Sequence, residues 1–346
     1  MNADFASLTI ENESVYAATG GTISVAAGRL SFALGFQGPC TSYDTACSST
    51  HVALHGAVSA IERRECGSAL TLTVSLMLAP RTHNVYARAG MLSADGRCKT
   101  FDARANGYVR GEGVGGLVLR AAGSADGPQP PAGLELSSSV VRQDGLSASL
   151  TAPNGVAQSR LVAAALAEAA VSPSELRLIE PHGTGTPLGD PTEIRSLVRA
   201  ASDATGVALF GIKANIGHLE PAAGSAGLLV LALSLRSRQI GACAQLRVMN
   251  PKIHEATLAG AQLAFPTQAT AAHLRAEGAA VAGVSSFGFS GTIAHTVMRA
   301  VATAAPPKAT EGRLVFRSRR FPWRAPPCSL LGAPHVASDD GVSFLA

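Results

Sequence analysis

Strand-like and helix-like segments alternate along this sequence in two series, and this alternation constrains the fold more than any other feature. The first series starts with a strand at 41–46 and a helix at 48–64, and continues with apolar strands at 68–78 and 113–122. The second series begins after a Gly- and Pro-rich break at 123–133. The pattern predicts an α/β fold with two similar halves whose sheets have parallel cores.

The second series has the same kind of elements and ends in a pair of strands. Its helices are expected at 156–170, 191–201 and 222–237, and its strands at 134–141, 176–181, 209–212, 280–291 and 292–299. In the first series, the run at 68–78 has no polar face, which predicts a strand covered on both faces.

Composition excludes several classes of protein. With 346 residues, 47% of them hydrophobic and 15% charged, the chain can bury a large core as one large or two fused domains. The net charge is only +4 and the one short basic patch lies at 313–324, so no nucleic-acid partner is expected. The most apolar run, 222–235, is shorter than the ~20 residues of a membrane span, and no signal peptide is visible.

The cysteines have neither the paired spacing of a disulfide framework nor that of a zinc site. This usage predicts a reduced, intracellular protein, although cytoplasm and plastid are not distinguished. The six cysteines are Cys40, Cys47, Cys66, Cys98, Cys243 and Cys328.

Cys47 occupies an unusual position in the stretch "YDTACSST". It follows a strand-like run and directly precedes a helix, whose N-terminus stabilises a thiolate. The alternative is a packed, inert thiol.

Two later histidines support the reactive interpretation of Cys47. His182 follows an apolar strand, and His218 lies in a loop before the long apolar helix. Strand-end loops are where open α/β sheets place their sites, although a lone histidine can also be structural. Lys213 precedes His218 and is expected to meet a carboxylate, Glu193 or Asp190, because an unpaired buried lysine is costly. Together these residues predict a thiolate nucleophile with imidazole partners.

Three other patterns are interpreted as structural. "GEGVGG" at 111–116 runs into a strand instead of opening a helix, so it predicts close packing and not dinucleotide binding. His51 and His55 lack the glutamate of a zinc-protease motif and are expected in the core or on the surface. A zinc site made of Cys47 and the two histidines has no paired ligand spacing, so no metal is expected.

Six blocks in this order resemble the β-ketoacyl synthases, specifically the ketosynthase domains of modular polyketide synthases and type I fatty acid synthases. The resemblance runs from about Ala18 to Met298. The blocks are "DTACSS", "AGMLSADGRCKTFDARANGYVRGEG", "LTAPNG", "EPHGTGTPLGDPTE", "GIKANIGHLEPAAG" and "GVSSFGFSGT".

The resemblance implies the thiolase fold, with two βαβαβαββ halves in α/β/α/β/α layers, usually as a homodimer. On the order of a hundred residues that precede Ala18 in the family are expected to be missing, which leaves the N-terminal half incomplete. The implied organisation is a partial N-terminal half at 1–121, a C-terminal half at 132–300 and a linker at 301–346. The linker also resembles the start of a dehydratase domain.

The resemblance also assigns roles to the reactive residues. Cys47 is implied to take an acyl chain from a phosphopantetheine arm as a thioester. His182 and His218 are implied to assist decarboxylation of a malonyl extender and to stabilise the enolate, with Lys213 organising the loop of His218. The backbone N–H groups of Phe289, a gating residue, and Cys47 would form an oxyanion hole.

The implied activity is decarboxylative Claisen condensation with malonyl-acyl carrier protein, without a cofactor of its own. Thr184 and Thr186 are implied to bind the pantetheine arm. Two departures stand against full activity, namely Ser290 for a glycine and Ile293 for an asparagine. A catalytically impaired or scaffold remnant is therefore the alternative function, whereas a degradative thiolase is disfavoured by the settings of the two histidines.

Overall fold

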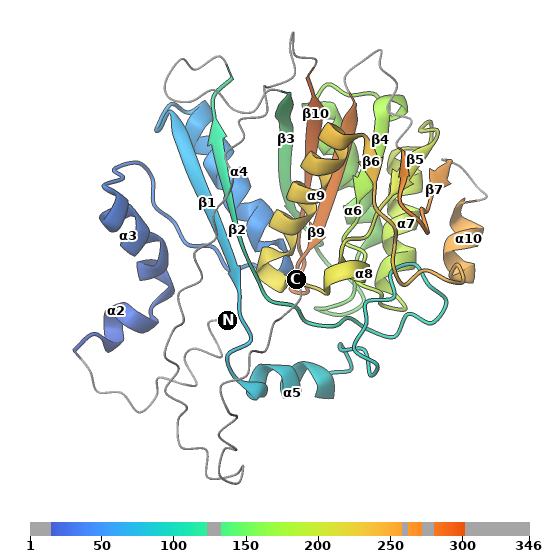
Figure 1. The fold of residues 1–346 in the computed structure, drawn as a ribbon, viewed down its shortest axis with the longest axis horizontal. Helices are drawn as coiled ribbons and strands as arrows, with labels where there is room; N and C mark the ends of the chain where they lie inside the picture. Colours follow the sequence, from blue (N-terminus) through green and yellow to red (C-terminus); the bar gives the residue numbers. More distant parts are fainter. Residues whose placement is uncertain (1–14, 123–132, 258–261, 272–279, 302–346) are drawn as a thin grey trace, which may run out of the picture. The chain divides into compact units, whose positions relative to one another are not determined.

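The computed structural model describes residues 15–122, 133–257, 262–271 and 280–301 (Figure 1). Residues 1–306 belong to one compact unit, so both predicted halves lie in the same body. The predicted linker, apart from residue 301, and the segment that resembles a dehydratase lie outside the described residues. The proposed boundaries between the halves remain a prediction.

The C-terminal half is built on a six-stranded sheet in the order β3-β10-β9-β4-β5-β7. β9, β4, β5 and β7 run parallel, whereas β10 pairs antiparallel with both β3 and β9. This confirms a mixed sheet with a parallel core. The strands are β3 (Leu134–Gln143), β4 (Leu176–Glu180), β5 (Val207–Leu209), β7 (Leu263–Ala264), β9 (Val281–Phe287) and β10 (Thr292–Ala300).

Helices cover both faces of this sheet (Figure 1). On one face, α6 (Gly155–Glu168), α7 (Gly189–Ala200) and α10 (Pro251–Thr257) bury an apolar cluster that includes Leu161 and Ile194. On the other face lie α4 (Ser49–Glu62) and α9 (Ala223–Ser237), packed around Leu54 and Leu231.

α4 and α9 approach closely because α9 has a glycine at the contact. A Cβ at Gly224 would lie 2.4 Å from Nδ1 of His51 on α4. The two helices form a central layer between the large sheet and the two strands of the N-terminal half. This layer brings the segment before α4, which holds Cys47, next to the segment before α9, which holds His218.

The N-terminal half contributes an antiparallel pair, β1 (Ser68–Ser75) and β2 (Gly113–Arg120), with α2 (Ala17–Gly21), α3 (Ile23–Leu34) and α5 (Pro80–Arg88). The expectation that β1 is covered on both faces is wrong for the described residues. Leu70 and Leu72 remain 38% and 40% exposed, and Val118 on β2 is 73% exposed. The described chain therefore packs α4 on one face of this pair and leaves much of the other uncovered.

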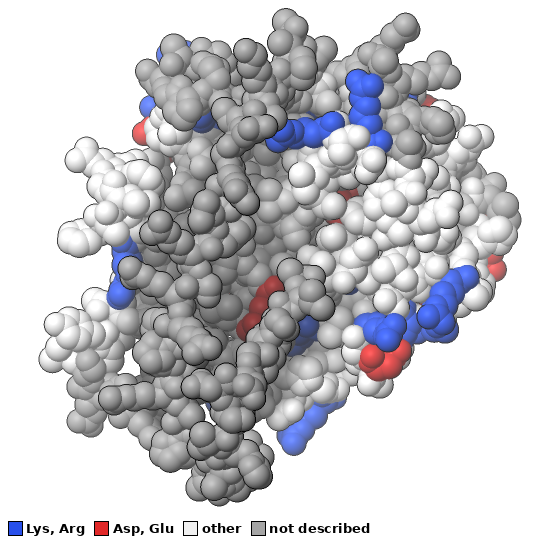
Figure 2. All heavy atoms as spheres, viewed as in Figure 1, with Lys and Arg blue, Asp and Glu red and all other residues white. Residues whose placement is uncertain are grey.

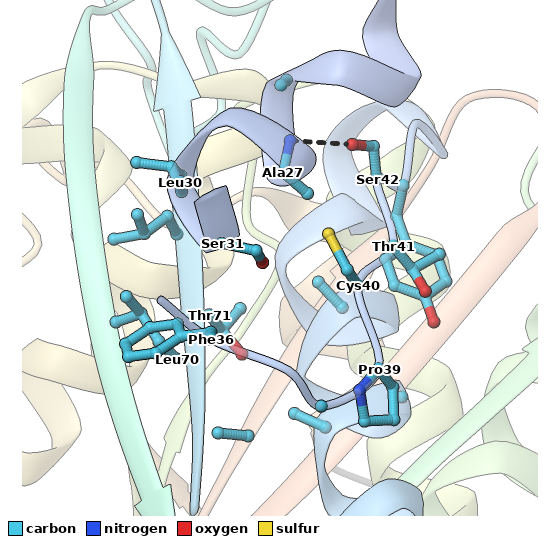
Figure 3. Close-up of a pocket in the computed structure, with 18 of the residues that line it drawn as sticks. Ala27, Leu30, Ser31, Phe36, Pro39, Cys40, Thr41, Ser42, Leu70 and Thr71 are labelled. Carbon is cyan, nitrogen blue, oxygen red and sulfur yellow. Dashed lines mark hydrogen bonds between the residues drawn. The ribbon is translucent and has the colours of Figure 1, made fainter. Parts of the chain in front are cut away.

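The strand expected at 41–46 is also absent. Residues 41–45 have no regular structure, and no described strand pairs with them. The segment instead borders a hollow between α3 and β1, where the Ala27 N–H donates to the Ser42 hydroxyl at 3.4 Å (Figure 3). This hollow is not lined by Cys47, His182 or His218.

The remaining short elements lie at the ends of the larger ones. β6 (Gln239–Ile240) pairs with β8 (Thr270–Ala271), and α8 (Lys213–Ile216) precedes the loop of His218. Short 3₁₀ turns, η1 (Ala46–Ser48), η2 (Pro173–Glu175) and η3 (Glu220–Ala222), precede α4, β4 and α9.

Among the described residues on the face shown in Figure 2, charged side chains are few. In Figure 2, the Lys and Arg side chains of the described residues lie scattered among uncharged ones and form no continuous patch. No helix within the described ranges is long and apolar enough to cross a membrane.

Candidate active site

Cys47 lies in the 3₁₀ turn η1, which runs directly into α4. The turn is tight, with Ala46 in the left-handed region at φ +55°. The Ser49 hydroxyl secures it by accepting the Thr45 N–H at 2.9 Å and donating to the Ala46 carbonyl at 2.7 Å. The predicted position of Cys47 at the tip of a helix is therefore present, although a turn and not a strand leads into it.

His218 reaches Cys47 from the C-terminal half. Its Nε2 lies 3.1 Å from Sγ of Cys47, and its ring is buried. The Thr50 hydroxyl of α4 donates to the Pro221 carbonyl at 2.6 Å, which ties the His218 loop to the helix of the nucleophile. Gly217, at φ +80°, turns the chain immediately before His218.

His182 completes the group from the end of β4. Its ring centroid lies 5.5 Å from that of His218, in an edge-to-face arrangement. Nδ1 of His182 accepts the Phe287 N–H at 3.3 Å, and Nδ1 of His218 accepts the Glu220 N–H at 3.2 Å. Because a backbone N–H can only donate, each neutral ring carries its proton on Nε2.

The charge states follow from burial. Burial lowers the pKa of both His182 and His218 well below the usual value, and the nearby Lys213 charge adds to the effect. Both imidazoles are therefore neutral hydrogen-bond donors at neutral pH. Burial also raises the pKa of the Cys47 thiol to about 12, with the Glu220 carboxylate as the second cause. Burial and the Glu220 carboxylate thus oppose the thiolate that the helix N-terminus favours.

Lys213 is buried, and the two carboxylates predicted to pair with it accept hydrogen bonds from backbone N–H groups. Glu193 accepts the N–H groups of His182 and Gly183, and Asp190 accepts that of Phe101. The ion pairs found among the described residues join Lys99 with Asp95, Arg104 with Asp102 and Arg110 with Glu220. Burial raises the pKa of Asp190 to about 6 and that of Glu193 to about 7, and the Lys213 charge opposes both shifts.

Glu180 is a buried acid that no sequence motif indicates. Burial raises the pKa of its carboxyl to about 8, and the Lys213 charge opposes this shift. Both oxygens accept the Ile212 N–H, at 3.1 and 3.3 Å, which fixes the start of the loop that carries Lys213 and His218. Its position two residues before His182 was the only signal in the sequence.

The residues expected to handle substrate lie around the same group. The hydroxyls of Thr184 and Thr186 lie 3.3 Å apart in the loop after His182. Phe289 is 41% exposed at the hairpin tip between β9 and β10, with its ring 6.4 Å from that of Tyr86. Ser290 is exposed beside it, whereas Ile293 is fully buried in the core cluster of α6 and α7. Ile293 thus packs among apolar side chains.

The hairpin tip touches the nucleophile turn at a glycine. A Cβ at Gly288 would lie 2.4 Å from the Thr45 carbonyl oxygen and 3.0 Å from the Ser48 hydroxyl. We expect Gly288→Ala to displace the turn and to slow acyl transfer to Cys47 by about 10²-fold, measured as uptake of a labelled acyl thioester. Gly67→Ala is the control, because its Cβ would meet no atom within 4 Å. Equal rates in the two variants would contradict this close-packing role.

The glycines of "GEGVGG" serve packing, as predicted. A Cβ at Gly113 would lie 2.4 Å from Leu219, and one at Gly115 would lie 2.4 Å from the Ser225 hydroxyl. His51 is confirmed as a core histidine, and Nδ1 of the partly buried His55 contacts the Ser139 carbonyl oxygen. No group of three or more His, Cys, Asp or Glu side chains arranged to hold a metal was found within the described ranges.

His51 predicts an acid-sensitive stability. Burial lowers its pKa to about 3, and neither ring nitrogen has a hydrogen-bond partner among the described residues. In the unfolded chain its pKa is about 6.5, so below that pH the unfolded state binds the extra proton and stability falls. We expect His51→Leu to gain stability over the unmodified chain by about 1.4 kcal/mol per pH unit between pH 6.5 and 3, measured by denaturant unfolding.

Thr296→Val is the matched control for this measurement. It also removes a buried polar atom without a hydrogen-bond partner among the described residues, but it removes no titratable group. Its effect on stability should be constant with pH. A constant effect of His51→Leu over the same range would contradict the assignment.

Comparison with known proteins agrees with this geometry. The family models "Beta-ketoacyl synthase, N-terminal domain" and "Beta-ketoacyl synthase, C-terminal domain" match residues 2–125 and 134–247. This chain belongs to the β-ketoacyl synthase family. The ketosynthase from module 6 of the bacillaene synthase of Bacillus subtilis superposes with a TM-score of 0.77 at 34% identity, over 83% of this chain and 51% of that one. The thiolase-type α/β fold of a ketosynthase is thereby confirmed.

Relatives by sequence are polyketide synthases. The polyketide synthase ThaG of Burkholderia thailandensis is 41% identical over 310 residues, which are 86% of this chain and 6% of that protein. Erythronolide synthase EryA3 of Saccharopolyspora erythraea is 39% identical over 297 residues, or 85% of this chain and 9% of that protein. The β-ketoacyl synthase chain thus spans a small part of these relatives and about half of the solved ketosynthase.

Proposed function

We propose that this chain is the ketosynthase unit of a polyketide synthase, which joins an acyl thioester to a malonyl unit by decarboxylative Claisen condensation. The observation that carries the proposal is the contact of 3.1 Å between Sγ of Cys47 and Nε2 of His218, with His182 beside them. A nucleophile and two neutral N–H donors are the groups that this reaction requires.

In the first step, Sγ of Cys47 attacks the carbonyl carbon of the incoming acyl thioester. The carbon–sulfur bond to the carrier breaks, and the thiol proton of Cys47 passes to the departing thiolate. The N-terminus of α4 and the Nε2–H of His218 stabilise the sulfur as its proton leaves. We assign the oxyanion hole for this step to the backbone N–H groups of Cys47 and Phe289.

In the second step, Nε2–H groups of His182 and His218 donate to the carbonyl oxygen of the malonyl thioester. The bond to the carboxylate breaks, carbon dioxide leaves and the electron pair is held as an enolate. The enolate carbon then attacks the acyl carbon on Cys47, the carbon–sulfur bond breaks, and the departing sulfur takes up a proton from water. Neutral imidazoles suit this role because the donor hydrogen is already in place.

Substrate handling is assigned to the surrounding residues. Thr184 and Thr186 are proposed to bind the phosphopantetheine arm of an acyl carrier protein, the partner that polyketide synthase relatives imply. Lys213 is proposed to hold the His218 loop through its charge, with Glu193 and Asp190 fixing the His182 loop. The chain needs no cofactor of its own for either step.

Three further features of the proposal concern assembly and location. The resemblance of the two halves to the ketosynthases supports a homodimer. The resemblance of the linker at 301–346 to the start of a dehydratase domain supports an adjoining dehydratase domain. An intracellular location is supported by the cysteines, because the five within the described residues are all free.

The test is formation of the carbon–carbon bond by the purified full chain. Hexanoyl and malonyl thioesters of pantetheine are supplied together, and the β-ketoacyl thioester is measured by mass spectrometry. The proposal expects product that depends on both thioesters. A folded chain that binds both thioesters but forms no product would support the remnant alternative.

A further inference from the structure

The loop of His218 is held by side chains of residues 108–110. Nε and Nη2 of Arg110 donate to the two carboxylate oxygens of Glu220 at 2.9 and 3.0 Å, and the Tyr108 hydroxyl donates to the same group at 3.3 Å. Arg110 and Glu220 are both buried, with their side chains 1% and 10% exposed. The two buried charges therefore compensate each other.

Glu220 is also strained at its backbone. Its φ of +45° lies in the left-handed region, which disfavours residues that have a Cβ. In this conformation its N–H donates to Nδ1 of His218 at 3.2 Å. The strained residue is thus the one that keeps the proton of His218 on Nε2, toward Cys47.

The backbone of the Arg110 segment meets the same loop. The His218 N–H donates to the Val109 carbonyl and the Gly111 N–H to the His218 carbonyl, both at 2.8 Å. These bonds hold the backbone of His218 against residues 109–111, but they do not orient the N–H of Glu220. The guanidinium of Arg110 lies 5.5 Å from the ring centroid of Tyr86, which covers its other side.

We propose that the Arg110–Glu220 ion pair is a positioning element that holds residue 220 in its left-handed conformation and thereby fixes the proton of His218 on Nε2. An ion pair that only joined the two halves could end on any residue of the loop. This one ends on Glu220, whose N–H donates to Nδ1 of His218. The inference rests on the proposed function, because it explains how one of the two donors of the condensation is set.

Two substitutions at one position separate the backbone effect from the loss of the side chain. Glu220→Ala removes the anchor and leaves the strain of a Cβ, whereas Glu220→Gly removes the anchor and also the strain. If the ion pair acts by holding the backbone of residue 220, Glu220→Gly should keep the His218 proton on Nε2 more completely than Glu220→Ala. A merely structural ion pair predicts equal losses, or a greater loss for glycine.

The readouts are the ¹⁵N chemical shifts of the His218 ring nitrogens in the substrate-free full chain, and the rate of malonyl decarboxylation. We expect a protonated Nε2 and an unprotonated Nδ1 in the unmodified chain. In Glu220→Ala and Arg110→Gln, the His218 proton should no longer be confined to Nε2. The rate of malonyl decarboxylation should fall by about 10²-fold. Glu220→Gly should keep the His218 proton on Nε2, and its rate of malonyl decarboxylation should fall by less than about tenfold.

Arg104→Gln is the control, since Arg104 also pairs with a carboxylate, that of Asp102, but its side chain is 47% exposed. It should change neither readout. If Arg110→Gln does not fold, the comparison of Glu220→Ala with Glu220→Gly still decides. An unchanged His218 proton in Glu220→Ala, or equal losses in the two Glu220 variants, would overturn the proposal. Because the NMR readout needs no substrate, a fixed Nε2 proton in a chain that cannot condense would refute only the proposed function.

Discussion

Cys47→Ala is expected to abolish transfer of a labelled acyl chain to the protein and to lower condensation by about 10⁴-fold or more. The alanine side chain has no nucleophile. Cys98 and Cys243 are buried, and their thiols are hydrogen-bonded to backbone groups of Val109 and of Leu209 and Gly211, respectively. The measurement is radiolabel retained on the denatured protein after incubation with an acyl pantetheine thioester.

Cys40→Ala is the matched control for this experiment, because Cys40 is a free and exposed cysteine seven residues before Cys47. It should retain full labelling at the active site. Labelling of Cys47→Ala at the rate of the unmodified chain would show that the acyl chain is carried elsewhere.

His182→Ala is expected to lower malonyl decarboxylation by about 10²- to 10³-fold while acylation of Cys47 continues. The variant removes one preorganised N–H donor for the enolate oxygen. It leaves Cys47 and its contact with His218 in place, since His182 is held separately by Glu193 and Phe287. Release of labelled carbon dioxide measures the first effect, and uptake of labelled acyl chain measures the second.

His218→Ala and His254→Ala complete the comparison. His218 contacts Sγ of Cys47 directly, so its loss should slow both acylation and decarboxylation. His254 lies exposed on α10, and its loss should slow neither. Undiminished release of carbon dioxide from His182→Ala would contradict the role assigned to His182.

The convergence of the reactive residues could be predicted from the sequence because each follows or precedes a strongly patterned element. Cys47 precedes an amphipathic helix, His182 follows an apolar strand, and His218 precedes a long apolar helix. Parallel strands and the helices between them place such ends at one edge of a sheet. The structure brings the three side chains together at that edge.

Elements whose stability depends on distant neighbours were predicted less well. The segment at 41–46 has the composition of a strand, but a strand forms only where another strand offers a ladder. The apolar runs of β1 and β2 likewise gave no information on which face is covered. Their exposure, such as 71% for Val114, depends on packing that no local pattern records.

The buried charges were the hardest to predict. Arg110, Glu180 and Glu220 look like ordinary polar residues in sequence, because burial of a charge depends on its partner in the fold. The thiolate predicted at Cys47 rested on the helix N-terminus and the imidazole partners. Burial and the Glu220 carboxylate, which raise the thiol pKa, depend on the fold and could not be predicted from the sequence.

The most direct test of the account is a single turnover on a chain acylated beforehand at Cys47. After removal of free acyl thioester, malonyl pantetheine thioester is added, and carbon dioxide, β-ketoacyl thioester and remaining acyl-enzyme are measured together. The account predicts that one carbon dioxide and one β-ketoacyl thioester appear for each acyl group lost from Cys47. Carbon dioxide released without loss of the acyl group from Cys47, or product formed while that group remains, would contradict it.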